Sequence, residues 1–132
     1  MFNVIVTGHA ELATGLVSAL TLIAGERDNV AVVEYHNGQS PEDLDERIQA
    51  AAATLKHDGP LLILTDLHGG TPFNRAGMYA LKHDNVEVFT GVNLPMLIQA
   101  ATTKKTTPAS VLKVMDAASK GVSRPLAQAK EA

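Results

Sequence analysis

The chain has 132 residues, of which 45% are hydrophobic and 19% are charged, and its formal net charge is −3. This length corresponds to one domain, which buries about two-thirds of its unfolded surface and needs no disulfide or metal to fold. The negative charge argues against nucleic acid as the main partner, because phosphate-backbone binding depends on a basic face. The absence of cysteine excludes disulfides and thiol chemistry.

The N-terminal residues run directly into an apolar strand pattern, with no basic segment and no long hydrophobic segment before it. No stretch approaches the 18 or so apolar residues that a membrane-spanning helix needs. We therefore expect a soluble, cytoplasmic protein.

Strand-like and helix-like periodicities alternate along the chain, which is typical of a parallel sheet covered on both faces. The first helix has leucine and isoleucine on one stripe, and the second has Ser40 and Pro41 at positions that suit an N-cap and a first helical residue. In chain order the sequence predicts strand 2–7, helix 11–24, strand 30–35, helix 41–56, strand 61–65, helix 72–82, strand 86–90, a short helix ending at 101, and a last helix from 108 to about 121.

Four such units favour an open, doubly wound α/β sheet with helices on both faces. In sheets of this kind, ligands bind beyond the carboxyl ends of the strands, where the winding direction reverses. If the strand order is 2-1-3-4, the first and third strands are neighbours. His9 and Asp66, which follow those two strands, then face each other across the crevice.

The segment 66–74, with the sequence Asp-Leu-His-Gly-Gly-Thr-Pro-Phe-Asn, carries the most functional information in the chain. A carboxylate ends the third strand, two glycines follow, and Thr71 and Pro72 are placed in the first turn of a helix. Free N–H groups at a helix N-terminus attract anions, so this loop is a candidate phosphate cradle. Taken alone, Asp66 could simply cap a turn, and the glycines could simply shape it.

The five histidines have different contexts. His9 follows a glycine at a strand end and precedes a helix, which favours a functional role. The other four are, on composition alone, incidental or undecided: His36, His57 and His83 are expected to be incidental, and His68 is undecided between a partner contact and an outward-facing side chain. Asn93 and Pro95 are candidates for the rim of the site, with loop geometry as an equally good explanation.

No serine or cysteine nucleophile paired with histidine, no triphosphate-binding signature and no metal-ligand spacing is evident. Histidine itself remains as the nucleophile. A carboxylate that accepts the Nδ1 proton would free Nε2 for attack and stabilise the resulting cationic ring. Thr71 and the peptide N–H groups of Gly70 and Thr71 could then neutralise phosphoryl oxygens without a metal or cofactor.

Three motifs in the same order resemble the mannose-family IIA component of the bacterial phosphoenolpyruvate:sugar phosphotransferase system: Gly-His after the first strand, the segment 66–74, and Gly-Val-Asn-Leu-Pro-Met at 91–96. The likeness spans about residues 1–121. It implies that His9 accepts phosphate from phospho-HPr on Nε2 and passes it to a IIB protein. It further implies that Asp66 orients the ring, and that Gly69, Gly70 and Thr71 contact the phosphate.

The resemblance also implies a homodimer in which a C-terminal antiparallel strand is exchanged between subunits, and membrane association only through the transporter. Residues 121–124 stand at the matching place, but Pro125 follows at once and removes a ladder donor, so this strand is short or absent. Residues 122–132 are therefore expected to form a C-terminal strand or a loosely held tail. The docking face for the partner proteins is expected around Leu67, Phe73, Met96 and Leu97.

Two other functions fit a chain of this kind. A response-regulator receiver has similar winding, but it needs acidic residues after the first strand to hold magnesium, where this chain has Thr7-Gly8-His9. A regulatory or dihydroxyacetone-system phosphocarrier domain of the same fold is the closer alternative. The transported sugar is not encoded here, because the family's selectivity lies mainly in its membrane components.

Overall fold

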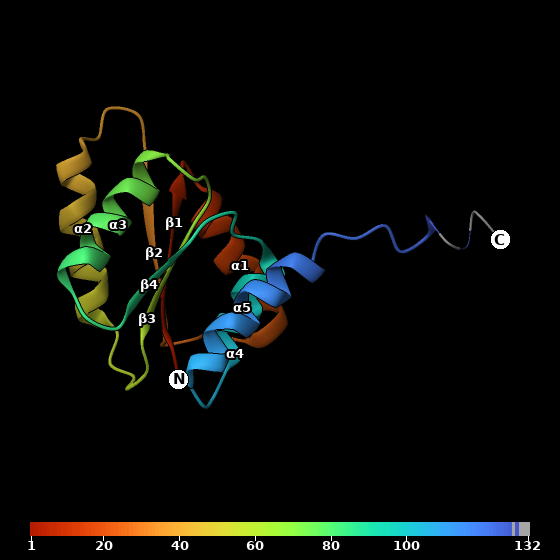
Figure 1. Cartoon of the computed structure of the whole chain (residues 1–132). Coiled ribbons are helices and arrows are strands. Elements are labelled where there is room, and N and C mark those ends of the chain that lie inside the picture. The colour runs from red at the N-terminus through yellow and green to blue at the C-terminus, as the bar shows by residue number, and fades with distance from the viewer. Residues whose placement is uncertain (128, 130–132) are drawn as a thin grey trace.

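The computed structural model describes residues 1–127 and 129, and strands alternate with helices through most of that length (Figure 1). The elements in chain order are β1 (Asn3–His9), α1 (Leu12–Ala24), β2 (Val30–Tyr35), α2 (Pro41–Thr54), β3 (Leu61–Thr65), α3 (Thr71–Lys82), β4 (Val86–Phe89), α4 (Leu94–Thr102) and α5 (Pro108–Lys120).

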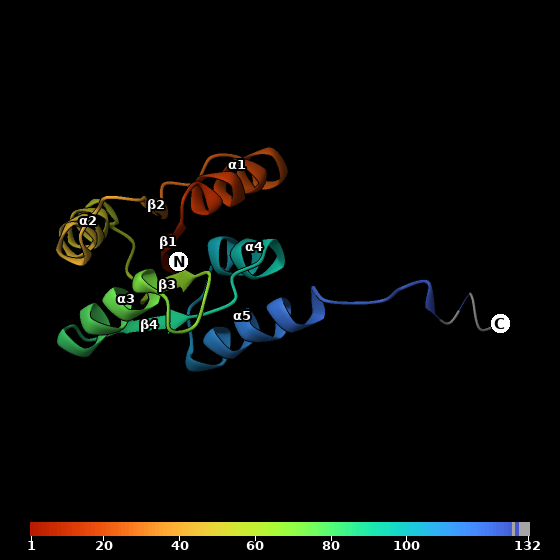
Figure 2. The same ribbon diagram turned by 90° about the horizontal axis from the view of Figure 1, so that it is seen from above.

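The four strands form one parallel sheet in the order β2-β1-β3-β4, as predicted. Figure 2 shows α2 and α3 on one side of this sheet and α1, α4 and α5 on the other. Because β1 lies between β2 and β3, the carboxyl ends of β1 and β3 are adjacent. This is the arrangement that the crevice hypothesis requires.

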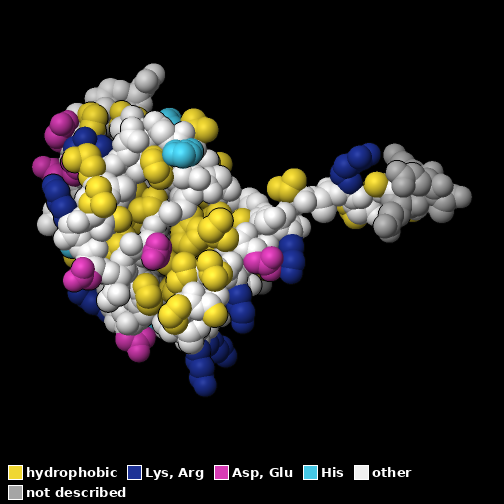
Figure 3. Space-filling model, viewed as in Figure 1, with side chains coloured by type: hydrophobic (Ala, Val, Ile, Leu, Met, Phe, Trp, Pro, Cys, Tyr) yellow, Lys and Arg dark blue, Asp and Glu magenta, His cyan; other side chains and the backbone are white. Residues whose placement is uncertain are grey.

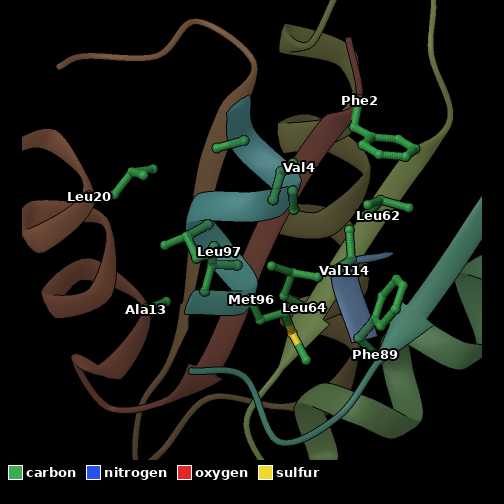
Figure 4. Packing of buried hydrophobic residues seen from close by; sticks show 13 residues of the cluster. Phe2, Val4, Ala13, Leu20, Leu62, Leu64, Phe89, Met96, Leu97 and Val114 are labelled. Carbon is green, nitrogen blue, oxygen red and sulfur yellow. The ribbon is translucent and has the colours of Figure 1, made fainter. Parts of the chain in front are cut away.

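Alternate residues of each strand supply the two halves of the core, as the two-residue period of a strand demands. Val4 and Val6 of β1 face the α1, α4 and α5 side, where they pack with Leu97 and Val114 (Figure 4). Ile5 faces the other side and packs under α2 and α3. Burial on both faces explains why the strands read as continuous apolar runs.

The predicted boundaries differ from the observed ones mainly at element ends. β1 continues two residues further than expected, to His9, because Gly8 and His9 still pair with β2. α2 stops at Thr54 rather than at residue 56, since Leu55 is already extended. α3 begins at Thr71, so the loop of residues 66–70 joins the helix directly.

After α5 the chain leaves the body of the domain (Figure 1). Residues 121–124 form no strand in this single chain. An exchanged strand needs a second copy to pair with, so its formation stays a prediction. Within residues 1–127 and 129, no helix has the length and apolarity that crossing a bilayer requires.

Candidate functional site

The site lies where β1 and β3 end side by side. His9 is the last residue of β1, and Asp66 comes directly after β3. These two strands pair in register up to Thr7 and Thr65. The sheet thus brings together two side chains that are 57 residues apart in sequence.

Both hydrogen bonds between these residues end on the same carboxylate oxygen. Nδ1 of the His9 ring lies 2.8 Å from Oδ2 of Asp66, and the His9 backbone N–H donates to that oxygen over 2.9 Å. The carboxylate is 13% exposed, whereas the imidazole is 48% exposed. Nδ1 is therefore held from inside the protein, and the ring that carries Nε2 reaches solvent.

The environment of Asp66 keeps its carboxyl group ionised. Partial burial acts to raise its pKa, but the hydrogen bonds from the His9 backbone and ring and the charge of a protonated His9 outweigh burial, so the pKa of Asp66 is lowered. Oδ1 is buried without a hydrogen-bond partner among the described residues. Among those residues, the Asp66 carboxylate is therefore hydrogen-bonded to His9 alone.

Two glycines allow the close approach of these groups. A Cβ atom at Gly8 would lie 3.0 Å from Cγ of Asp66, and one at Gly70 would lie 3.0 Å from Cε1 of His9. Any larger residue at either position would displace the carboxylate or the imidazole. Gly70 thus lies directly against the imidazole. Its sequence context did not predict this contact.

The loop before α3 has the expected cradle form, with one difference. Gly69 has a φ of +84°, which requires glycine, and Gly70 is the N-cap of α3. The Gly70 N–H donates to the Leu67 carbonyl over 3.1 Å. This N–H group is thus used inside the loop, and its contact with a phosphoryl group stays a prediction.

The first turn of α3 still offers donors for an anion. Within the described residues the backbone N–H groups of Thr71 and Phe73 make no hydrogen bond, as is usual at a helix start. The next N–H, of Asn74, is used by the Gly70 carbonyl over 2.9 Å. The N–H groups of Thr71 and Phe73 and the Thr71 hydroxyl therefore form an uncharged candidate site for an anion.

Sequence reasoning missed the role of Tyr35 and Ala10. Ala10 has a φ of +51°, a left-handed conformation that costs a non-glycine residue energy. Its N–H donates to the Tyr35 carbonyl over 2.8 Å, and the Tyr35 ring meets the His9 ring edge-on at 6.1 Å. This bridge turns the chain sharply after His9. Nothing in the sequence around Ala10 signals it.

The other histidines lie outside this pair. Nε2 of His57 contacts Asp28 over 2.8 Å, and the His83 ring stacks on Tyr79. His36 contacts Glu34 and lines a hollow that His9 also lines. His68, which sequence reasoning left undecided, packs edge-on against Phe73 with ring centroids 4.9 Å apart.

Residues that the sequence placed at the rim of the site or in the docking face have structural roles instead. Asn93 is the N-cap of α4, where its side chain accepts from the Met96 N–H and donates to the Ala118 carbonyl. Loop geometry is thus its explanation. Met96 and Leu97 are buried in the core, so their expected part in a docking face is wrong. Leu67, which is 60% exposed, remains available for one.

A histidine, an ionised carboxylate and a helix N-terminus thus lie at one crevice. Comparison with known proteins identifies the family in which this site occurs. The family model described as "PTS system fructose IIA component" matches residues 3–117. The chain belongs to this family. Members of the PTS IIA family are phosphotransferase-system components that transfer phosphoryl groups.

Individual proteins similar to this chain are also PTS components. The fructose-specific EIIA component of Bacillus subtilis is 30% identical over 75% of this chain and 68% of its own length. The mannose-specific EIIAB component of Escherichia coli is 32% identical over 73% of this chain, but that match covers 30% of the longer protein. A crystal structure of EIIA from Streptococcus agalactiae has a TM-score of 0.83 and 30% identity, covering 94% of this chain and 97% of that one.

Proposed function

We propose that this PTS IIA protein is a phosphohistidine carrier that accepts a phosphoryl group from phospho-HPr on Nε2 of His9 and passes it to a IIB component. The observation that carries the proposal is the hydrogen bond between Nδ1 of His9 and Asp66. It commits one ring nitrogen to the carboxylate and leaves the other for transfer.

In the proposed step, the lone pair of Nε2 attacks the phosphorus atom of the donor phosphohistidine. The bond between phosphorus and the donor nitrogen breaks, and its electron pair returns to the donor ring. No proton leaves His9, because Nδ1–H stays hydrogen-bonded to Asp66, which stabilises the cationic phosphorylated ring. Transfer to IIB is the same step in reverse, with a IIB side chain as the nucleophile.

The phosphoryl oxygens would be received by the first turn of α3. Gly70 lies against Cε1 of the imidazole, and Thr71 and Phe73, with their N–H groups and the Thr71 hydroxyl, follow it in the first turn of α3. Phosphoryl transfer depends mainly on positioning and electrostatic stabilisation, which these groups supply without a cofactor. The catalytic pair is His9 and Asp66, and the phosphate contacts are Gly69, Gly70 and Thr71.

The carrier would serve sugar uptake and phosphorylation from the cytoplasm, reaching the membrane only through the transporter. Residues 1–121 would be the IIA domain, and residues 122–132 its C-terminal segment. The relatives are specific for different sugars, among them fructose, mannose and sorbose, so the carrier role is proposed without assigning a sugar. These comparisons do not favour the regulatory or dihydroxyacetone-system alternative.

A homodimer is proposed on the open edge of β4. A groove of about 910 Å³ runs along β4 and α5, with apolar walls that include Phe89, Val111 and Met115. Figure 3 shows hydrophobic side chains gathered on this face of the molecule. An edge strand with free N–H and C=O groups accepts a further strand. Residues 121–124 of a second copy would occupy it, and sedimentation of the chain truncated after residue 121 would then give a monomer.

The carrier function is tested by incubating the chain with phosphoenolpyruvate, enzyme I and HPr. An acid-labile mass increase of about 80 Da is expected, as for one phosphoryl group. The His9→Ala variant should show none, while His57→Ala, which removes a histidine outside the site, should be labelled like the wild type. Labelling that persists in His9→Ala would overturn the assignment.

A further inference from the structure

A second histidine borders the hollow beside His9. The hollow has a volume of about 380 Å³, and its lining residues are His9, Ala10, Tyr35, His36, Asn37 and Gly38. It lies on the β2 side of β1, whereas the loop that contains Gly70 follows β3, on the other side. A phosphoryl group on Nε2 of His9 would therefore have the N-terminus of α3 on one side and this hollow on the other.

Strand pairing places His36 close to His9. Tyr35, the last residue of β2, lies opposite His9 in the parallel pairing of β1 and β2, and His36 comes directly after it. Neighbouring strands are about 4.8 Å apart and successive residues about 3.3 Å apart, so the two histidines start from backbone positions on the order of 6 Å apart. Figure 1 shows the chain turning from β2 toward α2 at the end of the sheet where β1 ends.

The His36 ring is held by a carboxylate that is itself held. Nε2 of His36 lies 3.0 Å from Oε1 of Glu34. The other oxygen of Glu34 accepts from the Thr14 hydroxyl over 2.6 Å, which ties Glu34 to the first turns of α1. The position of the His36 ring at the edge of the hollow is thus fixed from the protein side.

The ionisation of Glu34 decides which nitrogen of His36 is left free. Hydrogen bonds from the Thr14 hydroxyl and the His36 ring lower the pKa of Glu34, so its carboxylate accepts and does not donate. Nε2 of His36 therefore carries the proton of this bond. Among the described residues Nδ1 makes no hydrogen bond, and the side chain is 44% exposed. Nδ1 is an N–H donor when the ring is protonated and an acceptor when it is neutral.

A positive donor on the β2 side would complement the groups already assigned to the phosphoryl oxygens. Those groups, at the N-terminus of α3, are uncharged, and the carboxylate of Asp66 is negative. A phosphoryl group adds close to two negative charges. Hydrogen bonds in which the donor is charged are about twice as strong as neutral ones. A protonated His36 can supply such a bond, because the hollow joins its ring to that of His9.

We infer that His36 contacts the phosphoryl group on His9, with the protonated Nδ1 of His36 donating a hydrogen bond to a phosphoryl oxygen across the shared hollow. The inference rests on the proposed carrier function and adds a residue to its site. His36 would hold the phosphoryl group from the β2 side while the first turn of α3 holds it from the β3 side. The bonds that form and break in the transfer stay the same, and the contact stabilises the transferring group.

The charged and titratable groups around His36 come from several elements. Glu34 precedes it on β2, Arg47 of α2 donates to the Glu34 backbone carbonyl, His9 borders the hollow from β1, and Asp66 bonds His9. All of these groups are present in the wild type and in variants of His36. The ratio of wild-type to variant rates at each pH therefore isolates the charge change of His36, which a histidine undergoes between about pH 5 and pH 8.

The test compares His36→Gln with His36→Asn. A glutamine amide reaches the place of Nε2 and can still donate to Glu34, whereas an asparagine amide lies near the place of Nδ1 and can still donate into the hollow. A purely structural role is thus kept in His36→Gln, and a phosphoryl contact is kept in His36→Asn. The matched control is His57→Gln, because Nε2 of His57 also contacts a carboxylate, that of Asp28, outside the hollow.

The phosphorylation rate is measured across the histidine range with phospho-HPr and, separately, with phosphoramidate, a small donor that needs no docking surface. At about pH 6, His36→Gln should be phosphorylated about tenfold more slowly than the wild type by either donor, as loss of one charge-assisted hydrogen bond predicts. The difference should disappear above about pH 8, where the wild-type ring has lost its proton. His36→Asn should keep most of the rate throughout, and His57→Gln should match the wild type.

A loss in His36→Gln that has the same size at every pH would overturn the inference, since an ionising donor would then not be involved. A wild-type rate in His36→Gln together with a slow His36→Asn would also overturn it, because His36 would then act by holding Glu34. Wild-type rates in both variants would exclude the contact and leave the carrier function intact. No transfer from phospho-HPr to the wild type would count against the carrier function itself, and the inference about His36 would fall with it.

Discussion

Oδ2 of Asp66 accepts two hydrogen bonds from one residue, from Nδ1 of His9 over 2.8 Å and from its backbone N–H over 2.9 Å. The first bond sets the tautomer and orientation of the ring, and the second ties the carboxylate to the end of β1. Ring and main chain are thereby fixed together, so Nε2 is held in one direction relative to the N-terminus of α3.

Replacement of Asp66 by asparagine should slow transfer without unfolding the protein. The amide oxygen can still accept from the ring, but it lacks the charge that stabilises the cationic phosphohistidine. We expect the phosphorylation rate to fall about 100-fold, the lower range for loss of a positioned acid–base partner. Rapid-quench measurement with phospho-HPr checks this, and Asp28→Asn, which removes a carboxylate on His57, serves as the control. A wild-type rate in Asp66→Asn would remove the proposed role.

The lowered pKa of Asp66 predicts the pH dependence of stability. A carboxyl group whose pKa is lower in the folded than in the unfolded chain stabilises the fold above its unfolded value, about 3.9, and loses this contribution as pH falls through the folded value. The stability advantage of wild type over Asp66→Asn should therefore shrink below about pH 4.

Urea unfolding of both proteins between about pH 7 and pH 3 measures that difference. The pKa values of Glu34 and Asp45 are also lowered, but both residues are present in both proteins and cancel in the comparison. A difference in the free energy of unfolding that stays constant or grows toward acid pH would contradict the predicted direction.

Substitution of Gly70 by alanine should impair the chemistry more than the fold. Its methyl group would lie 3.0 Å from Cε1 of His9, closer than ordinary contact, so the exposed ring must turn. We expect a loss of about 100-fold in transfer rate, as misplacement of a reacting group by about 1 Å can cause. Gly77→Ala, whose methyl group meets nothing, should transfer at the wild-type rate. Equal rates in the two variants would show that the ring tolerates displacement.

Replacement of Ala10 by glycine should stabilise the protein by about 0.5 to 1 kcal/mol, because glycine adopts the φ of +51° without the cost that alanine carries. Thermal unfolding measures this gain. Asn85→Gly is the comparison, since Asn85 has a φ of +59° but asparagine tolerates that conformation, so its gain should be smaller. Destabilisation of Ala10→Gly would mean that the left-handed turn is not a source of strain.

The strands and helices could be predicted because they follow from strong sequence patterns, whereas the strand order entered as an assumption that the structure confirms. Continuous apolar strands and helix-start residues such as Ser40, the N-cap of α2, reflect burial and local hydrogen bonding. The pairing of His9 with Asp66 followed from the order, since parallel strands end at the same edge. The closeness of Gly70 to the imidazole could not be predicted, because it depends on loop coordinates.

Other features also could not be predicted, because they depend on three-dimensional packing and loop closure. Met96 and Leu97 follow a motif near the site, but their side chains point into the core, and residue order alone does not say which face of a short helix is covered. The engagement of the Gly70 N–H depends on how the loop closes on Leu67. The left-handed Ala10 has no signal, since alanine is common in every kind of local structure.

The central claim, that Nε2 of His9 carries the phosphoryl group while Asp66 holds Nδ1, is tested most directly by NMR of the phosphorylated protein. Phosphorus-31 and ring nitrogen-15 spectra distinguish the two phosphohistidine isomers. The account predicts one phosphohistidine, bonded through Nε2, that is lost in His9→Ala. Phosphate found on Nδ1 of His9, or on another residue such as Asp66, would contradict it.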